Sequence, residues 1–196
     1  MKYDPDIHHR RSVRLKGYDY SQAGIYFITI CTQNRECLLG EIINEAMKLS
    51  QFGSIAQQQW FEIEKRFPDI ELDEFVVMPN HIHGILIHKF VGAPLAGAQN
   101  ANDKIQTTVK GAPVLGSVIG GYKSLVIHHC LQHIKDSDSK IALGKFWQRN
   151  YHEHIIRNEA SLEKIREYVV NNPINWPVDE LNPGDREGRP YARGKM

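Results

Sequence analysis

Stretches dominated by β-branched and aromatic residues alternate along this chain with stretches in which apolar residues recur every three or four positions. The first pattern is typical of β-strands and the second of amphipathic helices. Strands are therefore predicted over residues 24–32, 71–78, 81–88 and 146–156, with residues 37–42 as a short partner of the first strand. Helices are predicted over residues 50–67, 115–134 and 159–171.

Local signals predict where several of these elements end. Pro68 and Pro173 are expected to stop the first and last helices, because proline lacks the N–H that a helix needs. Asn158 is a good N-cap for the last helix. Pro79 and Asn80 predict a bend or tight hairpin between the two middle strands.

The order of elements predicts an α+β fold, a small antiparallel sheet with helices packed on one face, as in ferredoxin-like or RNA-recognition-motif-like sandwiches. The length of 196 residues suits one domain, which we place at residues 21–176. Residues 1–20 are expected to be a basic arm and residues 177–196 a polar basic tail. Residues 89–113, rich in Gly, Ala, Asn, Gln and Pro, are expected to be a long mobile loop.

Composition narrows the class of protein. With 41% hydrophobic and 24% charged residues, the chain resembles a soluble globular protein, and it lacks an apolar run long enough for a transmembrane helix or a signal peptide. Three cysteines without zinc-site spacing suggest free thiols, so we expect a cytoplasmic protein and no membrane partner.

The charge distribution points to a role for the N-terminus. The net charge of +1 excludes a uniformly basic nucleic-acid binder, but four cations gather in a short segment. They are Arg10, Arg11, Arg14 and Lys16. Such a cluster can bind a phosphate backbone, although charge alone favours a solvated terminus.

Two histidines in the predicted strand 81–88 are the strongest functional signal. Side chains at positions i and i+2 of a strand point to the same face, so His81 and His83 should project together while Ile82 points into the core. Two imidazoles side by side form half of a metal site.

The last helix carries a second signal. Lys164, Tyr168 and Asn172 are spaced four apart and therefore share one helix face, beside an apolar stripe that can dock the helix on the sheet. A tyrosine at such a position is compatible with simple packing as well as with chemistry.

Other residues offer alternatives. His152 and His154 form a second pair, which could build a zinc hydrolase site with His81 and His83 and with Glu153 as the base, or could contact DNA or be structural. Tyr122 and Tyr151 compete with Tyr168 as nucleophiles, although Tyr122 has no metal-ligating partner four residues later. A non-catalytic single-strand binder is the third class, because aromatic residues on a small sheet can stack bases.

Three features, taken in their order along the chain, resemble the REP-associated tyrosine transposases. They are the His81–His83 strand, the segment 146–158 and the Tyr168 helix, which ends in Asn171, Asn172 and Pro173. These belong to the single-tyrosine HUH transposases of bacterial insertion sequences that move as single-stranded DNA. The resemblance runs from about Arg14 to Trp176.

The resemblance implies a specific chemistry. His81, His83 and Asn172 would bind a divalent ion, Mg²⁺ or Mn²⁺, although many relatives have glutamine at the position of Asn172. Tyr168 would attack the scissile phosphate of hairpin DNA of the REP type and form a 5′-phosphotyrosine. Apart from the resemblance, we expect DNA contacts from the basic arm and from residues near the site, namely Arg10, Arg11, Arg14, Lys16, Lys164, His152 and His154. Relatives include monomers and dimers that place the tyrosine helix across the interface, so a homodimer is one arrangement open to the chain.

Overall fold

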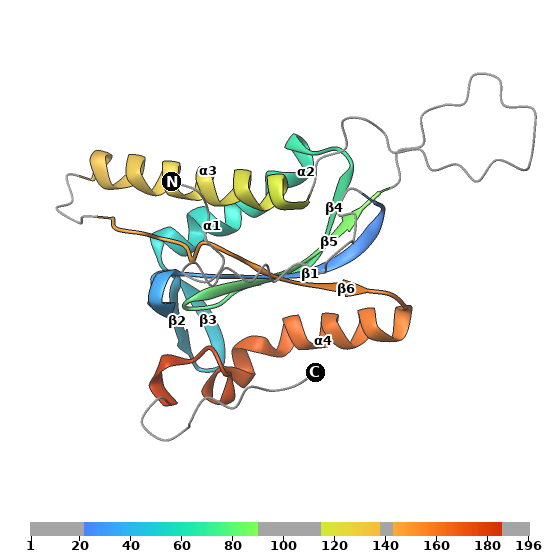
Figure 1. The fold of residues 1–196 in the computed structure, drawn as a ribbon. Coiled ribbons are helices and arrows are strands. Elements are labelled where there is room, and N and C mark those ends of the chain that lie inside the picture. Colours follow the sequence, from blue (N-terminus) through green and yellow to red (C-terminus); the bar gives the residue numbers. More distant parts are fainter. Residues whose placement is uncertain (1–21, 90–114, 138–142, 186–196) are drawn as a thin grey trace, which may run out of the picture.

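A computed structural model describes residues 22–89, 115–137 and 143–185 (Figure 1). The basic arm with Arg10, Arg11, Arg14 and Lys16, the loop 89–113 beyond Lys89, and the end of the tail lie outside the described residues.

The centre of the fold is a four-stranded antiparallel sheet in the order β4-β5-β1-β6. The strands are β1 (Gly24–Cys31), β4 (Ile70–Val77), β5 (His81–His88) and β6 (His152–Ile156). Met78 to Asn80 join β4 to β5, which confirms the predicted hairpin at this point. The register places Thr29 of β1 opposite His83 of β5, so these two side chains share a face of the sheet.

Helices cover both faces of this sheet. The helices α1 (Gln51–Phe61), α2 (Ile63–Arg66) and α3 (Leu115–Asp136) lie on one side, and α4 (Glu159–Asn175) lies on the other (Figure 1). The predicted α+β class is confirmed, but the expectation that the helices share one face is wrong. The sheet has apolar residues on both faces: Ile28 and Ile82 belong to the larger core beneath α1 and α3, and Ile85 packs with Leu162 of α4.

Gly84 sets the fit between β5 and α1. A Cβ atom at this position would lie 2.2 Å from Cζ2 of Trp60, which is closer than a side chain tolerates. The absence of a side chain at Gly84 lets the indole of Trp60 approach the strand that carries both histidines.

The predicted partner of β1 at residues 37–42 is wrong. The segment instead forms β2 (Gly40–Ile43), which pairs with β3 (Ala46–Leu49) in a separate two-stranded hairpin. The sequence reasoning missed β3 because each of its four residues is exposed or half-buried, so it lacks the apolar run of a core strand. The predicted helix 50–67 is interrupted at Glu62, where ψ is −7°.

Two further boundaries differ from the prediction. The strand predicted from residue 146 begins only at His152, because the backbone carbonyls of Gln148 and Asn150 accept hydrogen bonds from Lys123 Nζ at 2.8 and 2.9 Å. The last helix runs through Pro173 to Asn175 rather than stopping before it. A proline so close to a helix end removes only one hydrogen bond of the final turn.

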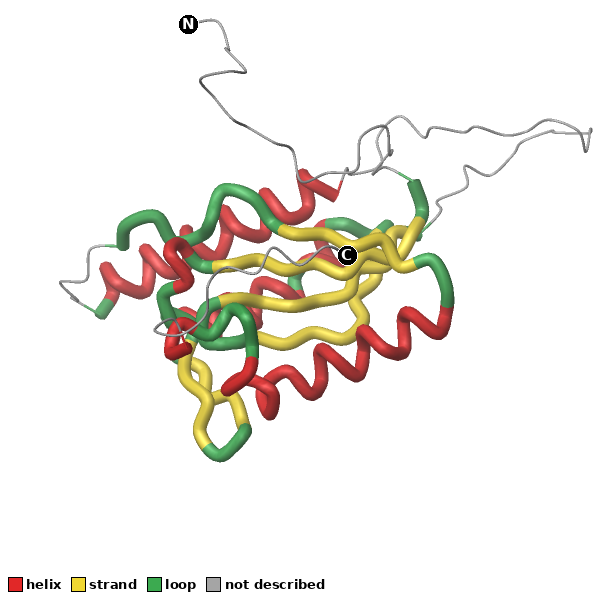
Figure 2. Tube along the Cα trace, turned by 60° about the horizontal axis from the view of Figure 1, so that its bottom comes forward, coloured by secondary structure: helices red, strands yellow, loops and turns green. Residues whose placement is uncertain are grey.

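Within the described ranges, no helix is both long and apolar enough to cross a membrane. The C-terminal end of α4, the short 3₁₀ helices η2 (Trp176–Val178) and η3 (Pro183–Asp185), and the β2–β3 hairpin gather at the same end of the sheet (Figures 1 and 2). His81 begins β5 at this end as well. The sheet end therefore brings together residues that are distant in the sequence.

Candidate metal and tyrosine site

His81 and His83 lie side by side on the face of β5 that α4 covers. Their side chains are buried, and their ring centroids are 4.5 Å apart. Ile82 between them points to the opposite face and belongs to the core. The predicted alternation of this strand is therefore correct.

The orientation of His81 is fixed by Asn80. Asn80 Nδ2 donates to the backbone carbonyls of Arg35 and Leu181 at 3.1 and 2.7 Å, so its Oδ1 is the acceptor that faces His81 Nδ1 at 2.8 Å. His81 Nδ1 must then carry the hydrogen, which leaves the lone pair on Nε2. This is the tautomer that binds a metal through Nε2, with Asn80 in the supporting role that metal-binding histidines usually have.

His83 is held by residues of the neighbouring strand β1. Its Nδ1 lies 2.9 Å from Oγ1 of Thr29, and its ring stacks on Phe27 with centroids 5.1 Å apart. Its Nε2 lies 3.3 Å from the hydroxyl of Tyr168. The second nitrogen of each histidine thus faces the space beneath α4.

Burial keeps both imidazoles neutral. Burial lowers the pKa of His83 to about 3. Burial also lowers the pKa of His81 well below its ordinary value, with the neighbouring His83 adding to the effect and Asn172 opposing it. Neutral imidazole is the form that binds metal ions.

The helix α4 is fixed at both its start and its middle. Asn158 caps its N-terminus as predicted, accepting a hydrogen bond from the backbone N–H of Ser161 at 2.8 Å. Leu162 packs against Ile85 of the sheet. Arg166 donates hydrogen bonds to both carboxylate oxygens of Asp73, at a bulge in β4, with an Nη2–Oδ2 distance of 2.6 Å.

Tyr168 lies two residues beyond this anchor, at the edge of the site. Tyr168 is 44% exposed, although its hydroxyl contacts Nε2 of His83. Burial raises the pKa of Tyr168, the charge of Asp179 raises it further, and Asn172 lowers it. The phenol is therefore protonated at neutral pH.

Asn172 lies one turn further along α4 and is almost fully buried. Its Oδ1 has no hydrogen-bond partner among the described residues, and the same holds for His81 Nε2. Buried polar atoms without partners are rare and costly in folded proteins. The set of predicted residues His81, His83, Tyr168 and Asn172 is thus brought together by the fold.

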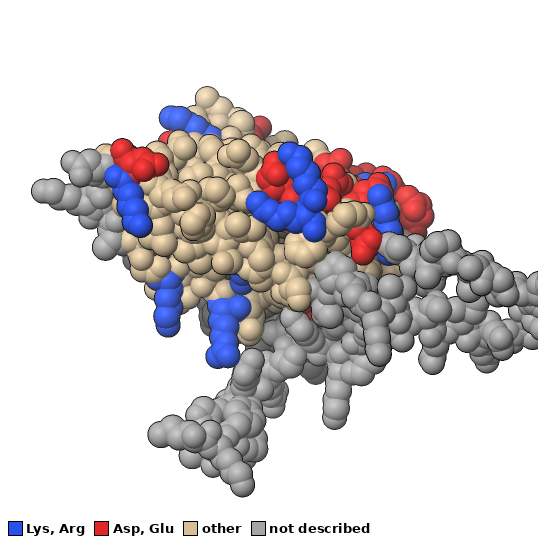
Figure 3. All heavy atoms as spheres, turned by 90° about the horizontal axis from the view of Figure 1, so that it is seen from above, with Lys and Arg blue, Asp and Glu red and all other residues tan. Residues whose placement is uncertain are grey.

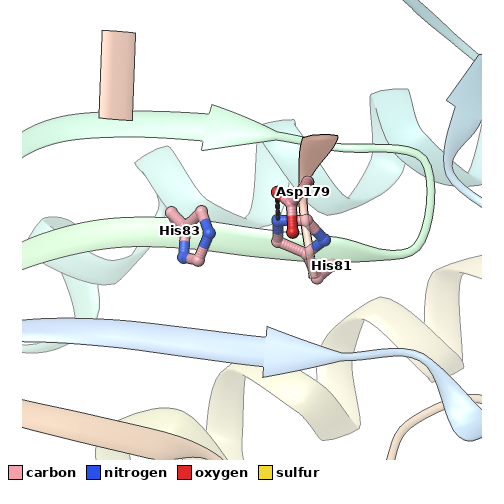
Figure 4. Close-up of side chains that lie close together, drawn as sticks. All are labelled: His81, His83 and Asp179. Atoms are coloured by element: carbon pink, nitrogen blue, oxygen red, sulfur yellow. Dashed lines mark ion pairs between the residues drawn. The ribbon is translucent and has the colours of Figure 1, made fainter. Parts of the chain in front are cut away.

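The sequence reasoning missed Asp179. Oδ2 of this residue lies 3.9 Å from His81 Nε2 (Figure 4), and the ligand atoms of His81, His83 and Asp179 all lie within 4.8 Å of one another. Asp179 falls in the segment predicted to be a polar tail. Its spacing from the histidines carries no periodic signal, and only its place just beyond the tyrosine helix hints at a role.

The second histidine pair lies on the same face of the sheet, but Glu153 does not. His152 pairs with Thr29 and His154 with Phe27, so both face the α4 side, and both are exposed. Glu153 lies opposite Ile28 and points to the other face. A zinc hydrolase that uses all four histidines with Glu153 as base does not fit this geometry.

The competing tyrosines lie away from the histidines. Tyr122 is buried in the core beneath α3, where its hydroxyl donates to the carbonyl of Ala56 at 3.0 Å, and burial raises its pKa well above the ordinary value. Tyr151 packs against the same core.

Lys164 is exposed on α4. Acidic and basic side chains are interspersed over the α3 face seen in Figure 3, where no single basic surface forms among the described residues.

No protein-family model matches the chain. A Haemophilus influenzae protein named "Uncharacterized protein" is 43% identical over 184 residues, which cover 92% of this chain and 97% of that protein. A second protein of this organism, named "Putative REP-associated tyrosine transposase", is 25% identical over 195 residues, covering 90% of this chain and 95% of that protein.

The fold has a counterpart among solved structures. The structure of a REP-associated tyrosine transposase bound to a REP hairpin superposes with a TM-score of 0.51 and 20% identity, over 83% of this chain and 73% of that chain. This likeness shows a shared fold. The chain therefore belongs to one family with the uncharacterized Haemophilus influenzae protein, and it is a RAYT-like protein, one like the REP-associated tyrosine transposases.

Proposed function

We propose that this transposase-like chain cleaves and rejoins single-stranded hairpin DNA through a covalent link to Tyr168, with a divalent ion bound by His81 and His83. One observation carries the proposal: the hydroxyl of Tyr168 lies 3.3 Å from Nε2 of His83, although the two residues are 85 positions apart. A partly exposed tyrosine held beside two neutral imidazoles is a nucleophile next to a metal site.

The residues present suit a divalent ion. His81 Nε2 and Asn172 Oδ1 are buried without partners among the described residues, and both offer lone pairs. Imidazole nitrogens and oxygen ligands suit Mn²⁺ better than Mg²⁺, which prefers oxygen alone, and both remain candidates. When bound, the ion acts as a Lewis acid that polarises the scissile phosphate.

The chemical step balances without a further reactant. The phenolic oxygen of Tyr168 attacks the phosphorus, a tyrosine O–P bond forms, and the bond from phosphorus to the 3′-oxygen breaks. The phenolic proton is lost to solvent or a base, and the leaving 3′-oxygen gains one to become a hydroxyl. The 5′-phosphotyrosine conserves the phosphodiester energy, so the reverse attack by a 3′-hydroxyl rejoins DNA without ATP.

The DNA is proposed to run over the exposed part of this face. His152 and His154 extend the surface from the histidine pair across β1 to the sheet edge, and Lys164 lies one turn before Tyr168 on α4. The basic residues of the N-terminal arm, Arg10, Arg11, Arg14 and Lys16, would add phosphate contacts. A relative in fold binds a REP hairpin, which supports hairpin DNA as the substrate class.

The test uses labelled single-stranded hairpin DNA with Mn²⁺, followed by denaturing electrophoresis. The wild-type protein should form a covalent protein–DNA species, and His81→Ala, His83→Ala and Tyr168→Phe should not, while DNA binding largely survives. Tyr151→Phe is the matched control and should remain active. A wild-type protein that binds DNA without metal and never forms the adduct would instead be a non-catalytic single-strand binder.

A further inference from the structure

Acceptor atoms converge at the end of β5 without a hydrogen between them. His81 Nε2 carries a lone pair, because the Nδ1 of this ring donates to Asn80. Asp179 Oδ2 faces that lone pair at 3.9 Å, which is too long for a hydrogen bond. Asn172 Oδ1 is a further buried oxygen without a partner in the described part of the chain. Facing acceptors repel one another unless a cation lies among them.

Asp179 is held rigidly with one oxygen toward His81. The backbone N–H of Leu181 donates to Asp179 Oδ1 at 2.7 Å, which leaves Oδ2 for another partner. The turn itself is bound to the sheet, because Asn80 Nδ2 donates to the carbonyl of Leu181 and Arg35 Nη1 donates to that of Glu180 at 3.1 Å. Asn80 therefore positions both the His81 ring and the turn of Asp179.

No lysine or arginine of the described residues forms an ion pair with this carboxylate. Its side chain is 7% exposed, and in the described ranges its one ion-pair neighbour within 4.0 Å is His81. Arg35, which lies close by, directs a guanidinium N–H to the carbonyl of Glu180. A buried carboxylate without a directly paired cation is costly, and a bound metal ion removes that cost.

We propose that Asp179 is a metal ligand, adding a carboxylate oxygen to the imidazoles of His81 and His83. This inference rests on the proposed function and adds the anionic ligand that the resemblance does not supply. Two neutral imidazoles and one carboxylate leave a net charge of +1 on a bound divalent ion, which favours an incoming phosphate. The site then includes the turn beyond α4 as well as the strand and the tyrosine helix.

The test measures metal affinity rather than cleavage. Mn²⁺ is titrated into the full chain and the free ion is followed by electron paramagnetic resonance, for wild type, His83→Ala, Asp179→Asn and Glu180→Gln. Asp179→Asn keeps the shape and the Oδ1 acceptor for Leu181, and Glu180→Gln removes the same charge from the exposed neighbour. We expect Asp179→Asn to weaken Mn²⁺ binding by at least about 10-fold, and Glu180→Gln to remain near wild type.

The outcomes separate this inference from the proposed function. If Asp179→Asn binds Mn²⁺ like wild type while His83→Ala does not, Asp179 is not a ligand and the histidine site stands. If Glu180→Gln lost as much Mn²⁺ affinity as Asp179→Asn, the loss would be a long-range charge effect, and the ligand assignment would also be refuted. If wild type binds no Mn²⁺, both the proposed function and this inference fail.

A second variant covers the case in which Asp179→Asn does not fold. Asp179→Cys places a thiolate at the site, and thiolates favour soft metals. This variant should gain Cd²⁺ binding with thiolate–metal absorption in the ultraviolet, whereas Glu180→Cys should not. Equal Cd²⁺ binding by the two cysteine variants would contradict the assignment.

Discussion

The two buried imidazoles should make the metal-free protein sensitive to mild acid. In the unfolded chain a histidine titrates near pH 6.5, whereas burial lowers the pKa of His83 to about 3 and that of His81 well below its ordinary value. Between these values the unfolded state binds more protons than the folded state. The contribution of the neutral imidazoles to the free energy of unfolding is therefore fully present above about pH 6.5, and it is lost as the pH falls below that value.

The size of the effect follows from the linkage. At about pH 5.5, one unit below the unfolded pKa, the neutral buried imidazole of His83 costs about 1.4 kcal/mol of the free energy of unfolding. His81 acts in the same direction, and a typical domain stability is only about 5–15 kcal/mol. Asp179 acts in the opposite direction, because burial raises its pKa.

The assay is urea unfolding in EDTA, followed by circular dichroism, at about pH 7.5, 6.5 and 5.5. His83→Gln removes one titrating group, so the free energy of unfolding should fall by about 1.4 kcal/mol less than in wild type between about pH 7.5 and 5.5. His154→Gln is the control, because it changes an exposed histidine on the same sheet face. Its free energy of unfolding should depend on pH as that of wild type does. If His83→Gln showed the same pH slope as wild type, the imidazole would not be buried in its neutral form.

Three other predictions concern the support of the site and the N-terminal arm. Arg166→Ala should lower the melting temperature at pH 7, because Arg166 forms an ion pair with Asp73 and lowers the pKa of that carboxyl. The difference from wild type should shrink as the pH falls below about 4, because this stabilisation disappears when the carboxylate is protonated. Gly84→Ala should destabilise by about 1–3 kcal/mol in chemical unfolding through its clash with Trp60, and a stability equal to wild type would contradict the packing. Deleting residues 1–13 should lower the salt slope of single-strand binding by about 0.7 for each phosphate that the arm neutralises, and an unchanged slope would show that the arm does not bind DNA.

The histidine pair and the tyrosine helix could be predicted because their signals are local. His81 and His83 share a strand face through an alternation that spans three residues, and Asn158 marks the start of α4 by its capping chemistry. The pairing of Tyr168 with His83 is not local. It could be predicted only from the resemblance to a family and from the apolar stripe that docks the helix.

The remaining features depend on contacts that no spacing reveals. Lys123 binds the carbonyls after Trp147 from a helix more than twenty residues away and so delays the start of β6. Asp179 reaches His81 because Asn80 and Arg35 bind the turn that carries it. Hydrogen bonds from side chains to distant backbone atoms leave no periodic pattern in a sequence, and these bonds determine which residues complete the site.

Identifying the tyrosine that carries the DNA tests the central claim most directly. The covalent adduct formed with hairpin DNA and Mn²⁺ is digested with nuclease and trypsin, and the residual nucleotide is located by mass spectrometry. Tyr122, Tyr151 and Tyr168 fall in separate tryptic peptides, residues 111–123, 150–157 and 167–186. The nucleotide should appear on the peptide 167–186, which contains Tyr168 as its single tyrosine. A nucleotide on either of the other two peptides, with none on 167–186, would contradict the proposed mechanism.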